Sequence, residues 1–270
     1  MKLWLILLPA LVLAGCLSER APEPAAAQAA STAAIPAASA GPLTAVQLVN
    51  GRKAVGHRDF ADAKKVLPAV FSGLEEDFYC GCPYTGKAMD LEACGYQVRK
   101  NLERASRLEW EHVVPAWVLG HQRQCWQQGG RKACTKTDDV FRMAEGDLVN
   151  LVPAIGEVNG DRSNYSFGAW TRNPEPMYGQ CRTIVDFKGR RAQPREEVRG
   201  RIARIYFYMH ERYGLKMSRQ DSQLMCAWAR SYPVDGWERE RDARIVRVQG
   251  SGNPFVSQGA RIDSVCPRAS

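Results

Sequence analysis

The chain has 270 residues and a formal net charge of +8, from 37 Lys and Arg against 29 Asp and Glu. The length allows one large domain or two small ones, and a hydrophobic fraction of 45% excludes a chain that is disordered or of low complexity as a whole. The charge favours a polyanionic partner, such as nucleic acid, anionic lipid or acidic glycan, about as strongly as it favours a basic surface without a dedicated partner.

The N-terminus has the features of a bacterial export signal. Lys2 precedes an apolar run, Leu3–Leu13, which is too short to span a bilayer but has the length of a signal-peptide core. The run ends in Leu13-Ala14-Gly15-Cys16, which resembles a lipobox with Cys16 as the lipidated residue, and Leu17 then favours the outer membrane. The alternative is a plain secretory signal that is cut in the Ala-rich stretch that follows. Either interpretation predicts export, as an outer-membrane lipoprotein or as a periplasmic or extracellular protein.

Residues 17–46 are mostly Ala, Pro, Ser and Thr, with almost no bulky apolar side chains. Such a segment cannot bury enough surface to offset the entropy of ordering it, so we expect a disordered tether after the signal segment, residues 1–16. The charges within residues 1–46 cancel, and the remaining residues, 47–270, carry the whole positive excess. Those residues contain no second linker and no internal repeat, so we expect one domain.

The first half of this domain is predicted to hold a helix near Phe60–Ala69, followed by strands and loops in the Gly- and Cys-rich residues 78–100. A short strand is expected at Leu108–Val114, because the run is β-tolerant and precedes Pro115, which cannot donate to a sheet ladder. The mixture of one helix and short strands already indicates a mixed architecture.

The second half is predicted to begin with another strand, Asp147–Val152, which ends before Pro153, and a helix near Ile155–Ser163. Three further segments have helical periodicity: 195–213, 218–231 and 237–248. The predicted fold class is therefore α+β, with few strands and many helices.

The cysteines indicate disulfides. Cys16 apart, eight remain, an even number that is typical of up to four disulfides in an exported chain: Cys80, Cys82, Cys94, Cys125, Cys134, Cys181, Cys226 and Cys266. Eight cysteines allow 105 pairings, and the natural pair by position is Cys125 with Cys134, which bracket a short Gly-rich loop. A structural zinc site is disfavoured, because Cys80-Gly81-Cys82 lacks the usual spacer and no paired His motif exists.

Two segments carry candidate chemistry. In Leu108–Pro115, a neutral His112 can take a proton from water and the neighbouring Glu111 can hold a hard cation. On an ideal strand these two side chains face opposite sides, so they can share a site only where the strand ends or bends. A lone His on a strand is more often a satisfied core residue. The second segment, Asp147–Arg162, leads from a strand into a helix rich in oxygen ligands.

Several stretches between about residues 70 and 266 resemble the bacterial endonuclease I family. They are Phe78–Cys82, Cys94–Asn101, Glu109–Trp117, Gly120–Trp126, Gly129–Lys132, Gly156–Arg162, Tyr178–Cys181, Val248–Gly250 and Asn253–Phe255. The resemblance implies a ββα-metal core, or His-Me finger, with several surrounding helices and stapling disulfides. It also implies an endonuclease.

The family's site residues are carried over position by position. His112 matches the general base, Glu111 the metal carboxylate, and Asn159 the second metal ligand on the helix. Arg131 matches the arginine that stabilises the cleaved phosphate, and Glu145 an acidic position near the site. The resemblance implies catalytic roles for His112, Arg131 and Glu145 and metal binding by Glu111 and Asn159.

Each assignment has a structural alternative. Asn159 precedes Gly160 and could simply form a turn. Arg131 could be a solvated loop charge, and Glu109 is interpreted as a surface residue or a partner of the ligands.

One departure from the family pattern concerns the cysteines. Where the family has a Cys after Trp-Glu near the C-terminal helix, this chain has Arg239, and Cys226 occurs on the preceding helix instead. We therefore do not carry over a disulfide map from the family, whereas the active-site assignments are unaffected.

The implied reaction is hydrolysis of DNA, and by the resemblance also RNA, to 5′-phosphate products. One Mg²⁺, for which Ca²⁺ or Mn²⁺ can substitute, would bind the phosphate and the leaving oxygen, while His112 deprotonates water and Arg131 holds the phosphate. Recognition of the backbone predicts weak sequence preference, and we expect a monomer that meets the membrane only through its lipid. The rival hypotheses are a lipoprotein that captures DNA without cutting it and a glycosidase that uses Glu109 and Glu111.

Overall fold

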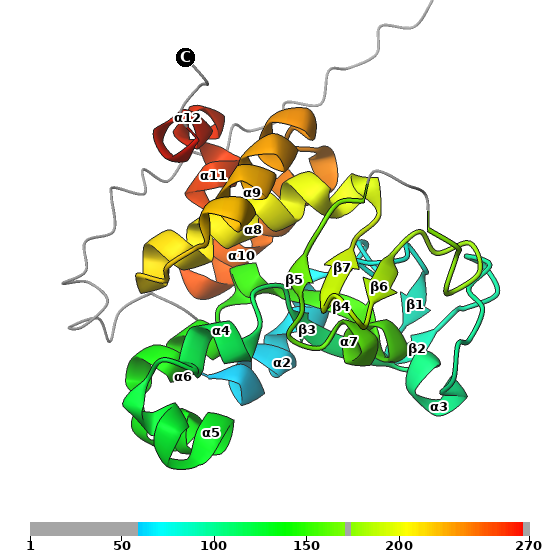
Figure 1. Cartoon of the computed structure of the whole chain (residues 1–270), viewed down its shortest axis with the longest axis horizontal. Helices are drawn as coiled ribbons and strands as arrows, with labels where there is room; N and C mark the ends of the chain where they lie inside the picture. The colour runs from blue at the N-terminus through cyan, green and yellow to red at the C-terminus, as the bar shows by residue number, and fades with distance from the viewer. Residues whose placement is uncertain (1–58, 171–173, 267–270) are drawn as a thin grey trace, which may run out of the picture. The chain divides into compact units, whose positions relative to one another are not determined.

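The computed structural model describes residues 59–170 and 174–266, and a two-stranded antiparallel sheet lies at its centre (Figure 1). Strand β3 (Leu108–His112) pairs with β4 (Leu151–Ile155), in register from Leu108 opposite Ile155 to His112 opposite Leu151. Helix α7 (Gly156–Arg162) follows β4 directly. The predicted signal segment, Cys16 and the tether lie outside the described residues.

The second predicted strand, Asp147–Val152, is wrong in its position. Leu148–Asn150 forms a 3₁₀ turn, capped by the Asp147 side chain, and β4 begins only at Leu151. Pro153 lies within β4, opposite Trp110, rather than ending it. Both strands of a two-stranded sheet are edge strands, where a residue without an N–H is tolerated.

Strand β3 ends at His112, two residues before the predicted end, because Asn150 takes over the pairing. Val113 donates its N–H to the Asn150 carbonyl oxygen (3.0 Å), and the Asn150 side chain accepts from the Val114 N–H (2.7 Å) and donates to the Val114 carbonyl oxygen (2.9 Å). The chain therefore leaves the sheet at His112 in a fixed direction.

The remaining strands are short and lie to one side of this sheet. They form an antiparallel pair and a three-stranded sheet in which β5 and β7 are parallel: β1 (Tyr84–Thr85), β2 (Ala88–Met89), β5 (Ser166–Phe167), β6 (Ile184–Asp186) and β7 (Arg191–Gln193). The short helix α3 (Leu102–Ala105) joins the first pair to β3.

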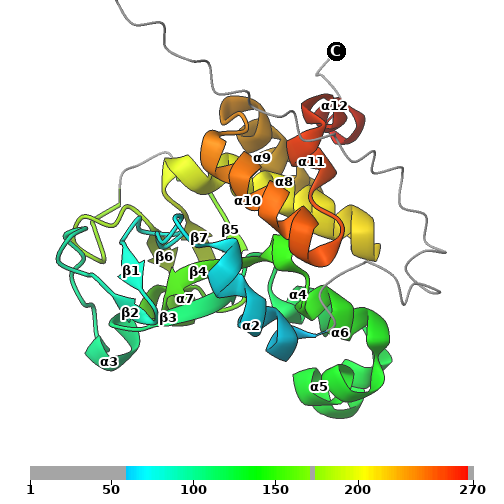
Figure 2. The ribbon, with the colours of Figure 1, turned by 180° about the vertical axis from the view of Figure 1, so that it is seen from behind.

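Two groups of helices flank the central sheet (Figures 1 and 2). One group follows it in the sequence: α8 (Glu196–Tyr213), α9 (Arg219–Ser231), α10 (Gly236–Gln249), α11 (Pro254–Ser257), the 3₁₀ turn Gly259–Arg261 and α12 (Ile262–Val265). The other lies between the two strands in sequence: α4 (Ala116–Gly120), α5 (Gln124–Thr137) and α6 (Asp139–Glu145). Helix α2 (Phe60–Val70) packs against α10 and α6.

The predicted α+β class with several surrounding helices is confirmed. The helices expected at 195–213, 218–231 and 237–248 correspond to α8, α9 and α10 within one or two residues at each end. Their apolar stripes are buried, as in α8, where Val198, Ile202 and Ile205 are at most 1% exposed. None of the helices in the described residues has the length and apolar character to cross a bilayer.

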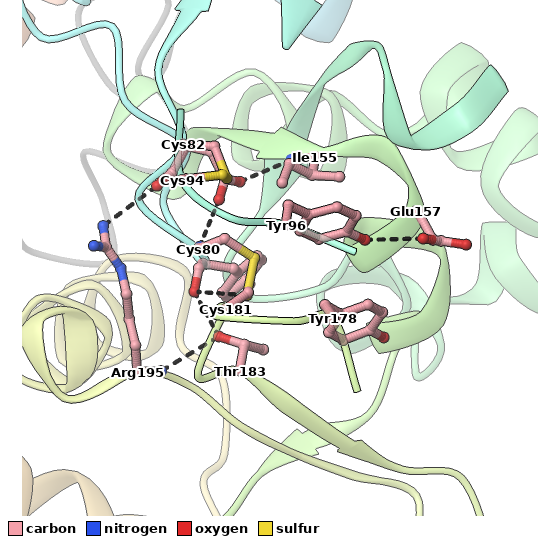
Figure 3. Close-up of a disulfide and its surroundings, with 12 residues drawn as sticks. Cys80, Cys82, Cys94, Tyr96, Ile155, Glu157, Tyr178, Cys181, Thr183 and Arg195 are labelled. Carbon is pink, nitrogen blue, oxygen red and sulfur yellow. Dashed lines mark hydrogen bonds between the residues drawn. A yellow bond between two sulfur atoms is a disulfide. The ribbon is translucent and has the colours of Figure 1, made fainter. Parts of the chain in front are cut away.

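Four disulfides staple the described residues: Cys80–Cys181, Cys82–Cys94, Cys125–Cys134 and Cys226–Cys266. Cys125 and Cys134 are the pair expected from their positions. Cys226 pairs with the C-terminal Cys266 and ties α9 to the end of α12. Figure 3 shows the Cys80–Cys181 and Cys82–Cys94 disulfides next to each other, on the two sides of one short stretch of chain.

Candidate active site

The end of β3 opens into a cavity of about 520 Å³ between the sheet, α7 and the α4–α5 helices. Four of the predicted site residues line it: Glu111, His112, Arg131 and Asn159. Glu145 lies behind the cavity wall, 2% exposed, and contacts two of the four. Glu111 and His112 reach the same cavity although they are neighbours, because β3 ends at His112.

His112 is buried, and its ring is held on two sides. Its Nε2 lies 2.8 Å from the backbone carbonyl oxygen of Glu145, and its ring centroid lies 4.6 Å from that of Phe60. A carbonyl oxygen only accepts, so Nε2 carries the proton in the neutral ring and Nδ1 is the acceptor. Burial, with the nearby Arg131 and Arg162, lowers the pKa of His112 to about 3, so the imidazole is neutral at physiological pH.

Glu111 is paired with a buried arginine. Its Oε1 accepts from Arg162 Nη1 (2.7 Å) and from the Tyr79 hydroxyl (3.2 Å). Burial raises the pKa of Glu111, and both partners oppose that shift. Arg162 also donates to the carbonyl oxygens of His112 (2.9 Å) and Val113 (2.6 Å), so one guanidinium fixes both the carboxylate and the end of β3.

Asn159 is oriented by Glu109. Its Nδ2 donates to Glu109 Oε2 (2.9 Å), which leaves Oδ1 as the acceptor atom of the amide. Glu109 is itself held by Arg104, at 2.8 Å and 3.0 Å, and by Arg107. Burial alone would raise the pKa of Glu109, but these arginines lower it below its usual value, which disfavours Glu109 as the proton donor that a glycosidase needs.

Arg131 reaches the cavity from α5. It follows Gly130, whose φ of +63° breaks α5 at a position that favours glycine, and its side chain is 46% exposed. Its Nε donates to Glu145 Oε1, and Thr135 Oγ1 donates to Glu145 Oε2 (3.2 Å). Glu145 therefore links two site residues, through its carbonyl to His112 and through its carboxylate to Arg131.

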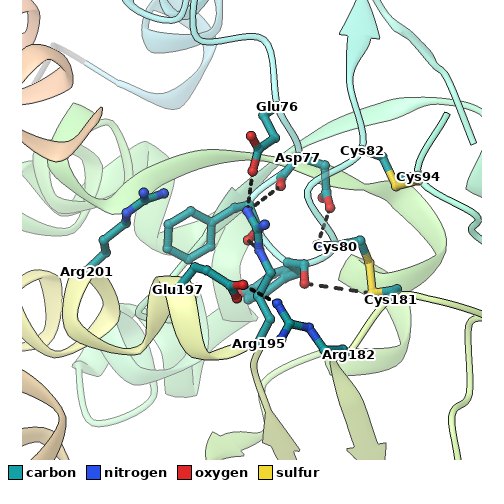
Figure 4. Close-up of polar contacts among 12 residues, drawn as sticks. Glu76, Asp77, Cys80, Cys82, Cys94, Cys181, Arg182, Arg195, Glu197 and Arg201 are labelled. Atoms are coloured by element: carbon teal, nitrogen blue, oxygen red, sulfur yellow. Dashed lines mark hydrogen bonds and ion pairs between the residues drawn. A yellow bond between two sulfur atoms is a disulfide. The ribbon is translucent and has the colours of Figure 1, made fainter. Parts of the chain in front are cut away.

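Thr183, Arg195 and β4 hold the segment Asp77–Cys82, which includes Tyr79, and together these contacts form a clamp (Figures 3 and 4). Thr183 Oγ1 donates to the Tyr79 carbonyl oxygen (2.6 Å), and Arg195 Nε donates to that of Phe78 (3.0 Å). The Asp77 carboxylate accepts from the backbone N–H of Ile155 in β4 (2.7 Å) and from that of Cys80 (2.5 Å). With the two disulfides beside it, this clamp fixes Tyr79, which donates to Glu111.

Sequence reasoning missed the partners of the site residues. Tyr79 and Arg162 lie inside matched motifs, but no spacing indicates that they meet Glu111. Phe60 lies outside every motif, and its contact with His112 is set by the packing of α2. The Glu109 side chain is 20% exposed and accepts a hydrogen bond from Asn159.

The oxygen donors fit a hard divalent cation. Within residues 59–170 and 174–266 no group of three or more His, Cys, Asp or Glu is arranged to hold a metal, so a cation here would rely on one carboxylate and one amide. Tyr79 and Arg162 both donate to Glu111 Oε1, and Asn159 donates through Nδ2. A carboxylate and an amide oxygen are donors of the kind that a hard cation such as Mg²⁺ prefers, with waters completing its coordination.

Comparisons with known proteins identify the family. The model of the endonuclease I family matches residues 58–260. An extracellular deoxyribonuclease of Aeromonas hydrophila is 54% identical over 204 residues, which cover 74% of this chain and 89% of the relative. A periplasmic deoxyribonuclease of the same organism is 52% identical over 74% of this chain and 85% of its own length. Endonuclease-1 of Buchnera aphidicola, strain APS, is 44% identical over 73% of this chain and 80% of its own length. The chain therefore belongs to the endonuclease I family and is an endonuclease.

Proposed function

We propose that this chain is an exported, Mg²⁺-dependent endonuclease that hydrolyses DNA, with His112 as general base and Glu111 and Asn159 as ligands of the cation. The proposal rests on the protonation state of the His112 imidazole. Its Nε2–H is engaged by the Glu145 carbonyl and its pKa is about 3, so Nδ1 is an unprotonated acceptor in a cavity lined by both oxygen donors. The extracellular and periplasmic deoxyribonucleases among the relatives support DNA as the substrate and export as the destination.

His112 takes the proton of the attacking water at Nδ1. The Glu145 carbonyl, 2.8 Å from Nε2, stabilises the imidazolium that forms, and Phe60 keeps the ring from turning away. When bound, a cation held by Glu111 and Asn159 would polarise the phosphate, stabilise the charge on the leaving 3′-oxygen and acidify nearby water, from which that oxygen would take its proton. Polarisation of the phosphate matters here because a base with a pKa of about 3 is weak.

Arg131 holds the scissile phosphate. Its half-exposed guanidinium is anchored through Nε on Glu145, which leaves the other donors of the planar fork for phosphate oxygens. Cleavage of the bond to the 3′-oxygen leaves a 5′-phosphate. These contacts read the backbone and not the bases, so we expect weak sequence preference and cleavage of RNA as well as DNA. The +8 charge supports such backbone binding. We further propose that Cys16 anchors the chain to the outer membrane and that the enzyme is a monomer.

The test is digestion of supercoiled plasmid and of RNA, with and without EDTA, by the wild type and by His112→Ala. We expect nicked and linear plasmid with 5′-phosphate ends, full inhibition by EDTA, and loss of cleavage in the variant. Plasmid that is bound but never cut would instead indicate a protein that captures DNA. Cleavage that persists in EDTA would contradict the assignment of a divalent cation to Glu111 and Asn159.

A further inference from the structure

We propose that Trp117, with His121 stacked against it, is a binding platform for an unpaired nucleobase beside the cleaved bond. The inference rests on the proposed nuclease function and adds a preference for single-stranded or frayed nucleic acid. Trp117 lies on α4, which begins four residues after His112, and His121 caps the C-terminal end of that helix. Trp117 lines the same cavity as Glu111 and His112.

The two rings form an ordered stack. Their centroids are 3.8 Å apart and their planes differ by 5°. His121 Nδ1 lies 2.8 Å from the Trp117 carbonyl oxygen, one helical turn earlier, and this hydrogen bond holds the imidazole over the indole. The imidazole of His121 thus covers one face of the indole. A nucleobase on the other face would extend the stack to three aromatic groups.

The indole is exposed where burial would be expected. Trp117 is 44% exposed despite the stack. Among the described residues, the other large apolar side chains with high exposure are Val98, Leu102, Phe187 and Val248, and none of these four lines the cavity. A large aromatic group left in water at the mouth of an active site indicates a surface that is covered by substrate.

The backbone under the platform is rigid. Leu119 and Gly120 of α4 are buried, and a Cβ on Gly120 would lie 2.2 Å from the ring of Trp126 on α5. Pro115 precedes the helix and fixes its first turn. The indole therefore meets its ligand from a fixed helix, so little ordering entropy is lost on binding.

The composition of the cavity indicates what the platform binds. Glu111 and His112 line it from β3 and Asn159 from α7, while the aromatic side chains Trp117 and Trp126 line it from α4 and α5. Two further rings of the lining, Phe60 and Trp110, come from α2 and β3. A phosphate bound near Glu111 and Asn159 would bring its own base within reach of the α4 and α5 rings. Every base has a π-face, so stacking selects for an accessible base and not for its identity, which suits an enzyme that reads the backbone. Bases inside a duplex are already stacked, so an unpaired nucleotide is the preferred ligand.

The test compares Trp117→Leu, which removes the ring but keeps an apolar helix former, with Trp117→Phe, which keeps a ring. Binding is measured in EDTA, so that the strand is not cut, with two fluorescent oligodeoxynucleotides of equal length, one with normal bases and one abasic throughout. We expect Trp117→Leu to weaken binding of the normal strand by about 5- to 150-fold, and Trp117→Phe to retain most of the affinity. On the abasic strand the two variants and the wild type should be equal. Phe187→Ala, which removes an exposed aromatic ring outside the cavity, is the matched control and should bind both strands like the wild type.

Two results would overturn the platform. Equal losses on both strands would show that Trp117 supports the fold and not a base, and unchanged binding in an active Trp117→Leu protein would show that no base stacks there. Thermal melting checks that the variants are folded. If Trp117→Leu does not fold, His121→Leu, which leaves the indole without its stacked partner, must weaken binding of the normal strand alone. A wild-type protein that neither binds nor cuts either strand would instead contradict the proposed function itself.

Discussion

The two sides of the cavity are built differently. On the β3–α7 side, Glu111 is 5% and His112 6% exposed, and both are held by groups that are themselves buried. On the α4–α5 side, Trp117 is 44% exposed and the Arg131 side chain 46%. Chemistry needs groups that are fixed before the substrate arrives, whereas binding of many sequences needs groups that a varied substrate can reach. Under the proposed function, we expect the β3–α7 side to perform the reaction and the α4–α5 side to hold the nucleic acid.

The largest effect should come from the buried side. His112→Ala removes the acceptor Nδ1 while leaving the cation ligands and Arg131 in place. We expect kcat to fall by about 10²- to 10⁴-fold, the usual contribution of a general base, with nearly unchanged DNA binding in EDTA. His210→Gln, a change at a partly buried histidine of α8 outside the cavity, is the control and should retain wild-type kcat. A large loss of DNA binding in EDTA by His112→Ala would show that His112 contributes to DNA binding. It would contradict the assignment of chemistry and binding to different sides of the cavity.

A second test asks whether the clamp around Tyr79 matters to chemistry. Cys80–Cys181 spans 101 residues and Cys226–Cys266 spans 40, so by loop entropy each stabilises the fold by about 4 to 5 kcal/mol. Replacing either pair by Ser should therefore lower the melting temperature to a similar degree. Only the Cys80→Ser/Cys181→Ser protein should also lose activity well below its melting temperature, because Tyr79 then no longer fixes Glu111. Equal activity in the two variants would mean that the clamp serves stability alone.

The elements of this fold were more predictable than the contacts of the site. The helices α8, α9 and α10 could be predicted from the 3.6-residue spacing of their apolar positions, because that spacing is a local property of the sequence. Strand β4 was misplaced because Pro153 was taken as a stop, and only the two-stranded sheet around it explains why it is tolerated.

The residues proposed for the site came from the family resemblance, but the contacts that hold them did not. The Arg162–Glu111 pair spans 51 positions, and the Asn159–Glu109 hydrogen bond spans 50. No local pattern records such a pairing, because it depends on how β3, β4 and α7 pack. The stack of Trp117 and His121 is a nearest-turn contact, but its exposure at the cavity is a property of the whole fold.

A third prediction concerns the acceptor that orients Asn159. Glu109→Gln weakens the hydrogen bond that orients the Asn159 amide, and it leaves both proposed cation ligands, Glu111 and Asn159, in place. We expect the Mg²⁺ concentration for half-maximal activity to rise by about 10- to 100-fold, the usual effect of losing a partner behind a metal ligand, with kcat recovered at saturating Mg²⁺. Glu103→Gln is the control, since Glu103 is exposed and pairs only with Arg107 among the described residues. An unchanged Mg²⁺ requirement in Glu109→Gln would count against Asn159 as a ligand.

The smallest predicted effect is a pH dependence of the free energy of unfolding. It tests the protonation state of His112, on the buried side, without measuring catalysis. Burial lowers the pKa of His112 from 6.5 to about 3 in the folded protein, so the unfolded chain binds this proton below pH 6.5 and the folded chain does so only near pH 3. The free energy of unfolding should therefore fall on acidification through this window, by about 1.4 kcal/mol per pH unit from His112. His210, whose pKa is also lowered by burial, adds to the slope, and Asp77, whose pKa burial raises to about 6, opposes it.

Because these other groups are common to both proteins, the difference between wild type and His112→Gln isolates His112. Denaturant unfolding in EDTA at pH 7 and pH 5.5 should show a steeper loss of stability in the wild type than in the variant. Parallel slopes for wild type and His112→Gln would mean that the folded protein admits a proton at His112 near neutral pH. In that case the imidazole would not be held neutral, and the assignment of Nδ1 as a standing acceptor would fail.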